Sequence, residues 1–333
     1  MDLFDPPVHP DPLGEALHDV RMSGAFYCRT ELTAPWGLTL PSLPEYVWFH
    51  VVAFGAMTLE AGDEAPVELR RGDLALVTHG AGHVLRSEPR APAPAIVDLE
   101  REEISDRYEI LRHGDGGAPT RLVCGAIRFD HPAARNLIAA LPDLIRIEAL
   151  AAPEVERMQG TLGLIAAETM RPRPGGEAVI TRLADVLVIQ AIRAWLETDS
   201  GAHTGWLGAL RDPQIGRALA VIHADPARAW TVALLAREVA MSRSAFAGRF
   251  TELVGEPAMQ YVTRFRMQLA VTALSEEGTT VAETATKLGY GSQAAFARAF
   301  RRVVGVAPGA VKRARRDPIG NRLQGLARSG SGV

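Results

Sequence analysis

The sequence predicts a two-domain α+β protein, with a small N-terminal β-barrel followed by a helical hairpin and a C-terminal all-α domain. At 333 residues the chain exceeds what one hydrophobic core usually organises. Residues 26–129 alternate short β-branched or aromatic runs with Gly, Pro and Asp, whereas apolar residues take helical spacing from Pro132 onward. The C-terminal third contains an internal repeat.

Seven segments of the N-terminal half are predicted to be strands. Each is short, rich in β-branched or aromatic residues, and bounded by turn residues. Many short strands with frequent turns are typical of a small barrel or sandwich. The predicted strands are 26–32, 46–54, 56–61, 66–69, 74–78, 95–99 and 121–129.

Helices are predicted at 133–141, 153–169 and 177–197. A turn rich in Arg, Pro and Gly at 171–176 separates the last two, which suits a helical hairpin that forms a dimer face or relays a signal. The predicted organisation is therefore an N-terminal domain at 1–200, a linker at 201–212, a C-terminal domain at 213–316 and a mobile tail at 317–333.

Charge is distributed unevenly along the chain. Residues 212–333 hold 17 Lys and Arg and 9 Asp and Glu, a net charge of +8, whereas residues 1–211 hold 19 and 30, a net charge of −11. A basic domain is typical of a protein that binds a polyanion such as double-stranded DNA, although a solvated basic surface has the same composition. No apolar run is long enough to cross a bilayer, and residues 1–12 are unlike a signal peptide. We expect a cytoplasmic protein without a membrane partner.

The basic half contains a duplicated unit. Residues 242–250 match residues 292–300 at an offset of 50, and residues 232–239 match 281–288 at an offset of 49. In each copy a Thr can cap a first short helix and a Ser can cap a second helix after a turn. Two Phe residues four apart mark the buried face of each second helix, which leaves its other faces free. This is the pattern of two helix-turn-helix units.

This half of the chain resembles the AraC/XylS family of transcription regulators. The resemblance covers residues 213–316 and includes a long helix expected at 258–275 between the two units. It implies a regulator, such as an activator, whose partners are double-stranded DNA and RNA polymerase. The residues that carry it are Ala285-Thr286-Lys287-Leu288-Gly289-Tyr290, Phe296, Phe300, Gly305 and Pro308.

The resemblance also assigns base contacts to both second helices. Arginine can bond guanine edges and glutamine an adenine edge, whereas alanine offers only methyl contacts. Two such helices on one chain would read a bipartite site whose halves lie about one helical turn, roughly 34 Å, apart. The assigned residues are Arg243, Ser244, Ala247 and Gly248 in the first unit and Gln293, Ala294, Ala297 and Arg298 in the second.

Other basic residues of this domain are expected to contact phosphates or solvent. Phosphate contacts set affinity and position more than sequence preference. These residues are Arg249, Arg264, Arg301, Arg302 and Lys312.

The N-terminal half resembles the cupin-type effector domain found in one branch of this family. Cys28, His50, His83 and Cys124 lie in or beside strands of one expected barrel, where inward side chains from different strands can converge. Two thiolates and two imidazoles suit a tetrahedral zinc or an iron site, with His79 as a substitute ligand. The barrel is therefore expected to sense a metal, an oxidant or a small-molecule effector.

Several alternatives stay open. Cys28 and Cys124 suit a disulfide switch under an oxidant equally well, and they also suit small buried hydrophobic residues beside a core histidine. An organic effector could bind a barrel lined by Trp36, Trp48 and Phe54.

Two other functions compete with a regulator. One is a metal-dependent cupin enzyme fused to a DNA-binding module, but His50-Val51-Val52 lacks the second histidine of the usual cupin metal set, so we expect no enzyme. The other is an architectural DNA binder, which would need no sensor. A possible homodimer is left open.

Overall fold

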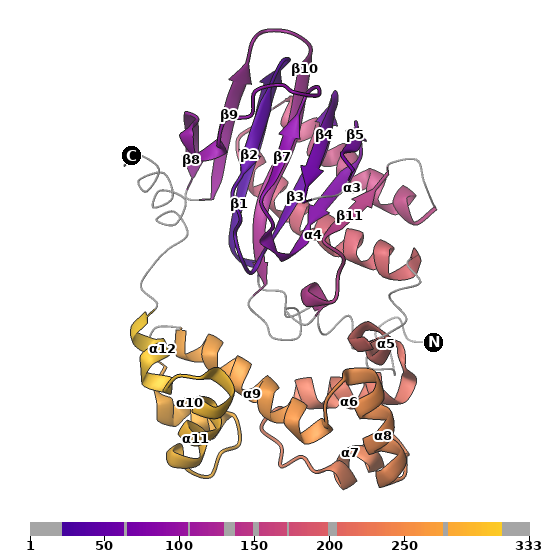
Figure 1. The fold of residues 1–333 in the computed structure, drawn as a ribbon, viewed down its shortest axis with the longest axis vertical. Helices are drawn as coiled ribbons and strands as arrows, with labels where there is room; N and C mark the ends of the chain where they lie inside the picture. The colour runs from indigo at the N-terminus through magenta and orange to yellow at the C-terminus, as the bar shows by residue number, and fades with distance from the viewer. Residues whose placement is uncertain are drawn as a thin grey trace. The chain divides into compact units, whose positions relative to one another are not determined.

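The computed structural model of the chain describes residues 22–62, 65–105, 107–129, 137–148, 153–171, 173–198, 205–275 and 279–314. Residues 22–129 and 141–198 gather into one compact unit, and residues 199–316 belong to a second (Figure 1). Each unit has its own buried apolar core. Among the described residues, no helix is long and apolar enough to cross a membrane.

The N-terminal unit contains a seven-stranded sheet, in the order β11-β6-β3-β10-β1-β9-β8, and a four-stranded sheet, in the order β2-β7-β4-β5. Paired strands are antiparallel except β1 and β9, which are parallel. The strands are β1 (Met22–Thr33), β2 (Gly37–Leu40), β3 (Tyr46–Phe54), β4 (Ala56–Ala61), β5 (Val67–Arg70), β6 (Leu74–Val77), β7 (His83–Arg86), β8 (Arg101–Ser105), β9 (Tyr108–Gly114), β10 (Pro119–Phe129) and β11 (Leu144–Ile147).

Buried side chains from both sheets form one core between them. Strand β3 shows how the alternation of a strand divides its residues. Trp48 and Val52 belong to this core, whereas Phe49 packs against Tyr27 with their ring centroids 6.0 Å apart. All but the last residue of β3 are buried, because both faces of the strand are covered.

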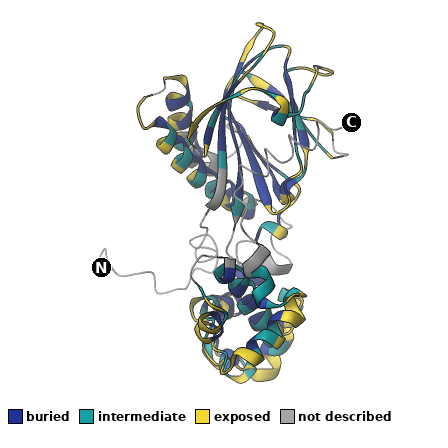
Figure 2. Ribbon diagram, turned by 90° about the vertical axis from the view of Figure 1, so that its left-hand side faces the viewer, coloured by how far each residue is buried: buried dark blue, intermediate teal, exposed yellow. Residues whose placement is uncertain are grey.

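The helical hairpin of α3 (Pro153–Met170) and α4 (Gly176–Thr198) lies along the outer face of the larger sheet (Figure 2). Two side chains of β1 reach it. The Tyr27 hydroxyl donates to Asp185 Oδ1 of α4 at 2.5 Å, and Arg29 Nη1 lies 3.5 Å from the Thr169 carbonyl oxygen of α3. Both predicted hairpin helices are therefore present, and they pack on the barrel.

The C-terminal unit is helical, and α9 runs between two helix-turn-helix units formed by α7–α8 and α10–α11 (Figure 1). One core lies under the first unit and another under the second. The described helices are α5 (Gly205–Arg211), α6 (Pro213–Ala224), α7 (Val232–Glu238), α8 (Arg243–Val254), α9 (Ala258–Ser275), α10 (Val281–Lys287), α11 (Gln293–Val304) and α12 (Pro308–Ala314).

The structure corrects two predictions. The strand predicted at 95–99 is wrong: Ile96–Asp98 form a 3₁₀ helix, because the Asp98 and Leu99 N–H groups donate to the Ala95 and Ile96 carbonyl oxygens of the same segment rather than to a neighbouring strand. The linker predicted at 201–212 is wrong over residues 205–211, which form α5 and bury Leu207 and Ala209. Strands β2, β7, β8, β9 and β11 were not predicted.

Two further predictions fall wholly or partly outside the described residues. The mobile tail predicted at 317–333 is one of them. Of the helix predicted at 133–141, only residues 137–141 are described, and residues 137–139 are helical.

Candidate functional site

Helix α8 exposes the residues predicted to contact bases in the first unit. Its N-terminus is capped by Ser242, whose hydroxyl accepts a hydrogen bond from the Ala245 N–H at 3.2 Å. Phe246 and Phe250 are completely buried and anchor the opposite face in the core. Because of this anchoring, the helix leaves one face exposed or half-buried at Arg243, Ser244, Ala247 and Gly248.

Helix α11 repeats this arrangement in the second unit. Its cap is Ser292, which accepts from the Ala295 N–H at 3.2 Å, and its anchors are Phe296 and Phe300. The predicted base-contacting residues again lie on the exposed or half-buried side: Gln293, Ala294, Ala297 and Arg298.

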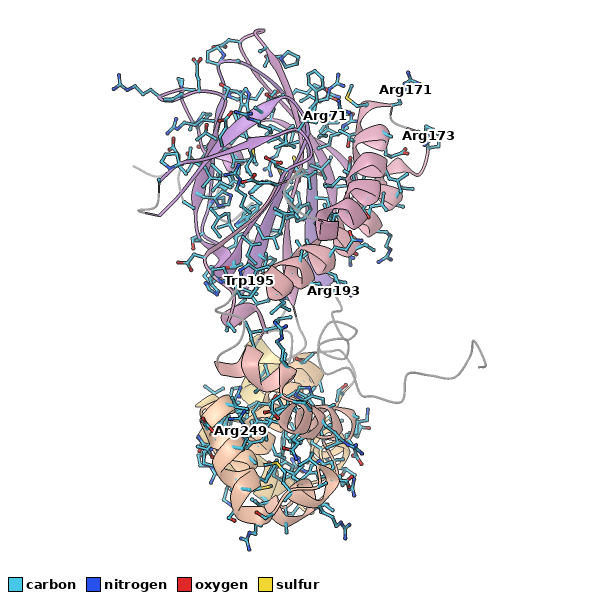
Figure 3. The ribbon with its side chains drawn as sticks, turned by 90° about the vertical axis from the view of Figure 1, so that its right-hand side faces the viewer. Arg71, Arg171, Arg173, Arg193, Trp195 and Arg249 are labelled. Carbon is cyan, nitrogen blue, oxygen red and sulfur yellow. The ribbon has the colours of Figure 1, made fainter. Side chains whose placement is uncertain are left out.

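Two of the predicted phosphate contacts are already paired within the protein. Arg249, on the surface of the C-terminal unit (Figure 3), lies 3.1 Å from Asp212 Oδ2 and 3.3 Å from Glu252 Oε2, and hydrogen bonding to these carboxylates raises its pKa. Arg264 lies 2.6 Å from Glu256 Oε1. A phosphate would have to compete with these carboxylates for both guanidinium groups.

Four other arginines present their charge without such competition. Arg243, Arg298, Arg301 and Arg302 are exposed and form no ion pair with any residue that the structure describes. Arginine presents five donors and stays charged at every physiological pH. The side chain of Lys312 lies outside the described ones.

The strand register of the barrel brings three predicted ligands into one row. Cys28 of β1 lies opposite Cys124 of β10, and Cys124 lies opposite His50 of β3. Residues directly opposite on neighbouring strands share a face, with Cβ atoms about 4.5–5.5 Å apart. His83 of β7, in the smaller sheet, contacts His50. We call these four buried residues the barrel cluster.

The two imidazoles of the barrel cluster meet tip to tip, with His50 Nε2 and His83 Nε2 2.7 Å apart. Because His83 Nδ1 lies 2.9 Å from the carbonyl oxygen of Ala81, which can only accept, His83 carries its proton on Nδ1. Its Nε2 is then the acceptor and His50 Nε2 the donor. This leaves His50 Nδ1 as a bare nitrogen, buried and without a hydrogen-bond partner among the described residues.

Burial keeps the barrel cluster uncharged. It lowers the pKa of His83 to about 4 and, together with the nearby His83, lowers the pKa of His50 well below its usual value. It also raises the pKa of Cys28 to about 12 and that of Cys124 well above its usual value. Neutral imidazole is the form that binds metals, but a protonated thiol is neither a ligand nor a nucleophile.

The barrel cluster fits a metal only in part. Zinc needs about four donors around one point, and the described residues contain no group of three or more His, Cys, Asp or Glu side chains that could hold a metal ion. Only the imidazoles of His50 and His83 converge. His79 does not join them, since its Nδ1 lies 2.9 Å from Asp143 Oδ1 at the protein surface.

Of the aromatic residues predicted to line the barrel, two lie inside it. Trp36 and Trp48 are 1% and 2% exposed, and neither indole nitrogen has a hydrogen-bond partner in the described part of the chain. Trp48 stacks on His50 with their planes 11° apart. Phe54 is 38% exposed and does not belong to the core between the sheets.

Sequence reasoning missed the outward neighbours of Cys28. Tyr27 and Arg29 flank it on β1 and contact the hairpin through Asp185 and the Thr169 carbonyl. Burial and the hydrogen bond to Asp185 raise the pKa of Tyr27. The available signal was the position of a Tyr and an Arg on either side of an inward-facing residue in a predicted strand.

Comparisons with known proteins agree with this architecture. The chain matches a family model described as Cupin over residues 11–197 and one described as Helix-turn-helix domain over residues 235–314. It is 34% identical over 301 residues to an AraC-like transcription regulator of Streptomyces lividans, covering 90% of this chain and 97% of that protein. It is 27% identical to the transcriptional regulator AlkR of Acinetobacter baylyi, covering 88% and 95%. The solved structure of ToxT from Vibrio cholerae covers 86% of this chain and 96% of that one, at 12% identity and a TM-score of 0.33.

The two matched regions divide the chain as the structure does. The cupin match spans the barrel and its hairpin, which is more than half of the chain, and the helix-turn-helix match falls on the unit that contains α8 and α11. The Streptomyces relative aligns across both regions. The chain therefore belongs to the AraC family of transcription regulators, in which it combines an N-terminal cupin domain with a C-terminal helix-turn-helix domain.

Proposed function

We propose that this regulator reads double-stranded DNA in a sequence-specific manner through α8 and α11 and that its effector acts at the barrel cluster. For DNA reading, the carrying observation is that each helix is capped and anchored by two buried Phe residues while its predicted base-contacting face stays open. Arg243 and Arg298 supply exposed guanidinium groups on those faces, and neither forms an ion pair with a described residue. We infer that Arg298 bonds a guanine edge and that Arg301 and Arg302 contact phosphates.

The test compares Arg298→Ala with Arg301→Ala, since both side chains are exposed on α11. A duplex selected by the wild-type chain is varied one base pair at a time, and the dissociation constants are measured at one stated salt concentration. Arg298→Ala should cost about 1–3 kcal/mol, concentrated at one base pair, whereas Arg301→Ala should weaken binding to every sequence equally. An unchanged sequence preference in Arg298→Ala would move this residue to the phosphate contacts.

The barrel cluster is proposed as the effector site because the register brings Cys28, Cys124 and His50 into one buried row that meets His83. Zinc or iron is one candidate effector, because both metals bind imidazole and thiolate, although only the imidazoles of His50 and His83 converge among the described residues. It would be held by the two imidazoles, with one or both thiols completing the site, and would keep those thiols deprotonated. His83 already has the Nδ1–H bond to a carbonyl that orients a ligand histidine, whereas His50 Nδ1 has no such partner among the residues that the structure describes.

An oxidant is the second candidate effector, and the pairing of Cys28 with Cys124 favours it. Opposite residues in antiparallel strands have Cα atoms about 4.5–5.5 Å apart, within the range that a disulfide spans. A peroxide would take two electrons and two protons from the two thiols. The thiols would form one S–S bond, and the peroxide would be split into one water and one alcohol, or into two waters when it is hydrogen peroxide. The raised pKa of both thiols makes this reaction slow at neutral pH.

Elemental analysis of protein purified without chelator, together with a thiol count before and after mild peroxide, separates these effectors. Stoichiometric zinc or iron that disappears in His83→Ala and Cys28→Ser supports the metal. Metal-free protein that reversibly loses two thiols supports the oxidant. Metal-free protein with inert thiols excludes both and leaves an organic effector, to which Trp36 and Trp48 could donate through indole nitrogens that have no partner among the described residues.

The outer face of the hairpin is proposed as a contact between two copies of the chain. Four large apolar side chains of α3 and α4 are exposed, and a contact between two copies would remove such side chains from water. The exposed apolar residues are Leu164 and Met170 on α3 and Val179 and Val186 on α4.

RNA polymerase is proposed as a further partner of the C-terminal unit.

The relatives are named transcription regulators, which points to a protein that is not an enzyme. The competing function, a metal-dependent cupin enzyme with a DNA-binding module, would require turnover in the presence of added iron. If the protein binds DNA but shows no turnover after iron is added, the result supports the regulator.

A further inference from the structure

One arginine connects the two helix-turn-helix units beyond their shared helix. Arg266, half-buried on α9, points back to the loop between α6 and α7. Its Nε donates to the Pro226 carbonyl oxygen at 2.5 Å, and its Nη2 donates to the Arg228 carbonyl oxygen at 2.6 Å. Hydrogen bonds from a charged guanidinium are about twice as strong as neutral ones. Arg266 therefore ties α9 firmly to the first unit.

The same guanidinium contacts the turn of the second unit. It lies 5.8 Å from the ring centroid of Tyr290, within the distance of a cation–π contact. Next to it, Gly289 adopts φ +77°, and a Cβ at this position would lie 2.1 Å from the Ala227 carbonyl oxygen. The turn of the second unit therefore touches the loop of the first one, with Arg266 hydrogen-bonded to the loop and in cation–π contact with the turn. We call Pro226–Arg228, Arg266 and Gly289–Tyr290 the junction.

The loop on the first unit is itself held in place. Trp230 Nε1 donates to the Asp225 carbonyl oxygen at 2.8 Å, and the Arg228 guanidinium lies over the Trp230 ring at 4.4 Å. Arg228 also bonds Glu238 of α7 at 2.9 Å. The side of the junction that belongs to the first unit is thus fixed by its own contacts.

We infer that Arg266 is a positioning residue that fixes the separation and twist of α8 and α11, so that the regulator reads its two half-sites at one spacing. This inference rests on the proposed reading of DNA by both helices. The two units have separate cores, which share the half-buried Leu269 of α9. Inserting one base pair moves a half-site by about 3.4 Å and rotates it by about 35°. A reader held at the junction cannot follow that movement.

The experiment uses the full chain and a duplex selected by the wild-type protein. Dissociation constants are measured for this duplex and for versions with one base pair inserted or removed between the two halves. We expect the wild-type chain to lose about 30-fold in affinity on either change, because the displaced half loses its base contacts. In Arg266→Gln the loss caused by the change in spacing should fall below about 5-fold, although affinity for the selected duplex also falls.

Arg264→Gln is the matched control. Arg264 lies two residues away on α9 and is also partly buried, but its ion pair is with Glu256 and its ring contact is with Tyr261, 5.1 Å away, both in the first unit. The Arg264→Gln substitution should weaken DNA binding by the same factor at every spacing of the two half-sites. Arg266→Lys is the gentler second variant, because it keeps the positive charge but replaces the planar guanidinium fork, whose Nε and Nη2 reach the two carbonyls, with a compact ammonium. Thermal unfolding of each variant checks that the fold persists.

The outcomes separate the two levels of the argument. A wild-type chain without any spacing preference would overturn the proposal that α8 and α11 both read bases. The junction would then have no role in sequence recognition. A wild-type spacing preference that both Arg266→Gln and Arg266→Lys retain in full would overturn the positioning role of Arg266 alone. The positioning role is supported if a change in spacing costs both Arg266 variants less affinity than it costs the wild-type chain, while Arg264→Gln loses as much as the wild-type chain does.

Discussion

The barrel should lose stability in mild acid because its two histidines are buried as neutral rings. Burial lowers the pKa of His83 from 6.5 to about 4, so the unfolded chain binds a proton at this residue before the folded chain does. The stability linked to His83 is therefore complete above about pH 7 and is lost as the pH falls from 6.5 toward 4. The full difference is about 3 kcal/mol, of which about 2 kcal/mol is lost between pH 7.5 and 5. His50 acts in the same direction, since its pKa is also lowered.

His83→Gln removes this titration while keeping a polar side chain. The assay is urea unfolding of the full chain with chelator at pH 7.5 and at pH 5, followed by tryptophan fluorescence, to which Trp36 and Trp48 contribute from the barrel interior. The wild-type chain should lose about 2 kcal/mol more than His83→Gln between the two pH values. His79→Gln is the control, since His79 lies at the surface beside Asp143. An equal loss in His83→Gln and the wild-type chain would refute the argument that a buried neutral His83 controls acid stability.

Three other predictions follow from the packing. Phe296→Ala should destabilise the second helix-turn-helix unit by about 3–5 kcal/mol, because the ring is completely buried, and thermal unfolding with DNA titration checks both stability and binding. Thr280→Ala should cost about 1 kcal/mol in the same melt, since Thr280 and Glu283 form a capping box at α10; an unchanged melting temperature would show that the cap contributes nothing. Val186→Glu should shift a dimer toward monomer in sedimentation velocity, whereas a wild-type chain that is already monomeric would contradict the hairpin contact.

The C-terminal unit was predictable because its signals are local. A Ser before each recognition helix and two Phe residues four apart specify where the helix begins and which side is buried, and both need only one turn of neighbouring sequence. The exposed faces of α8 and α11 follow from the same periodicity. What they bind at each position stays a prediction, because base preference depends on the groove that the helix enters.

The barrel was less predictable because its strands depend on distant partners. Strand β8 is mostly exposed and rich in charge, and β2 and β7 are only four residues long, so their own sequences carry little strand signal. The barrel cluster was named from residue types alone. Its row depends on the pairing of Cys28 with Cys124 and of Cys124 with His50, which are long-range registers that no local pattern encodes.

The two arginines of α9 show where a charge pattern stops being informative. Arg264 and Arg266 have the same chemistry and lie two residues apart, and the sequence favoured Arg264 as a phosphate contact. Two residues turn a helix by about 200°, so the two side chains leave α9 on opposite sides. One meets Glu256 and the Tyr261 ring, and the other meets two carbonyls of one unit and the turn of the next. The residue that a basic-patch count would treat as one more surface charge is thus the one placed to set the geometry of DNA reading.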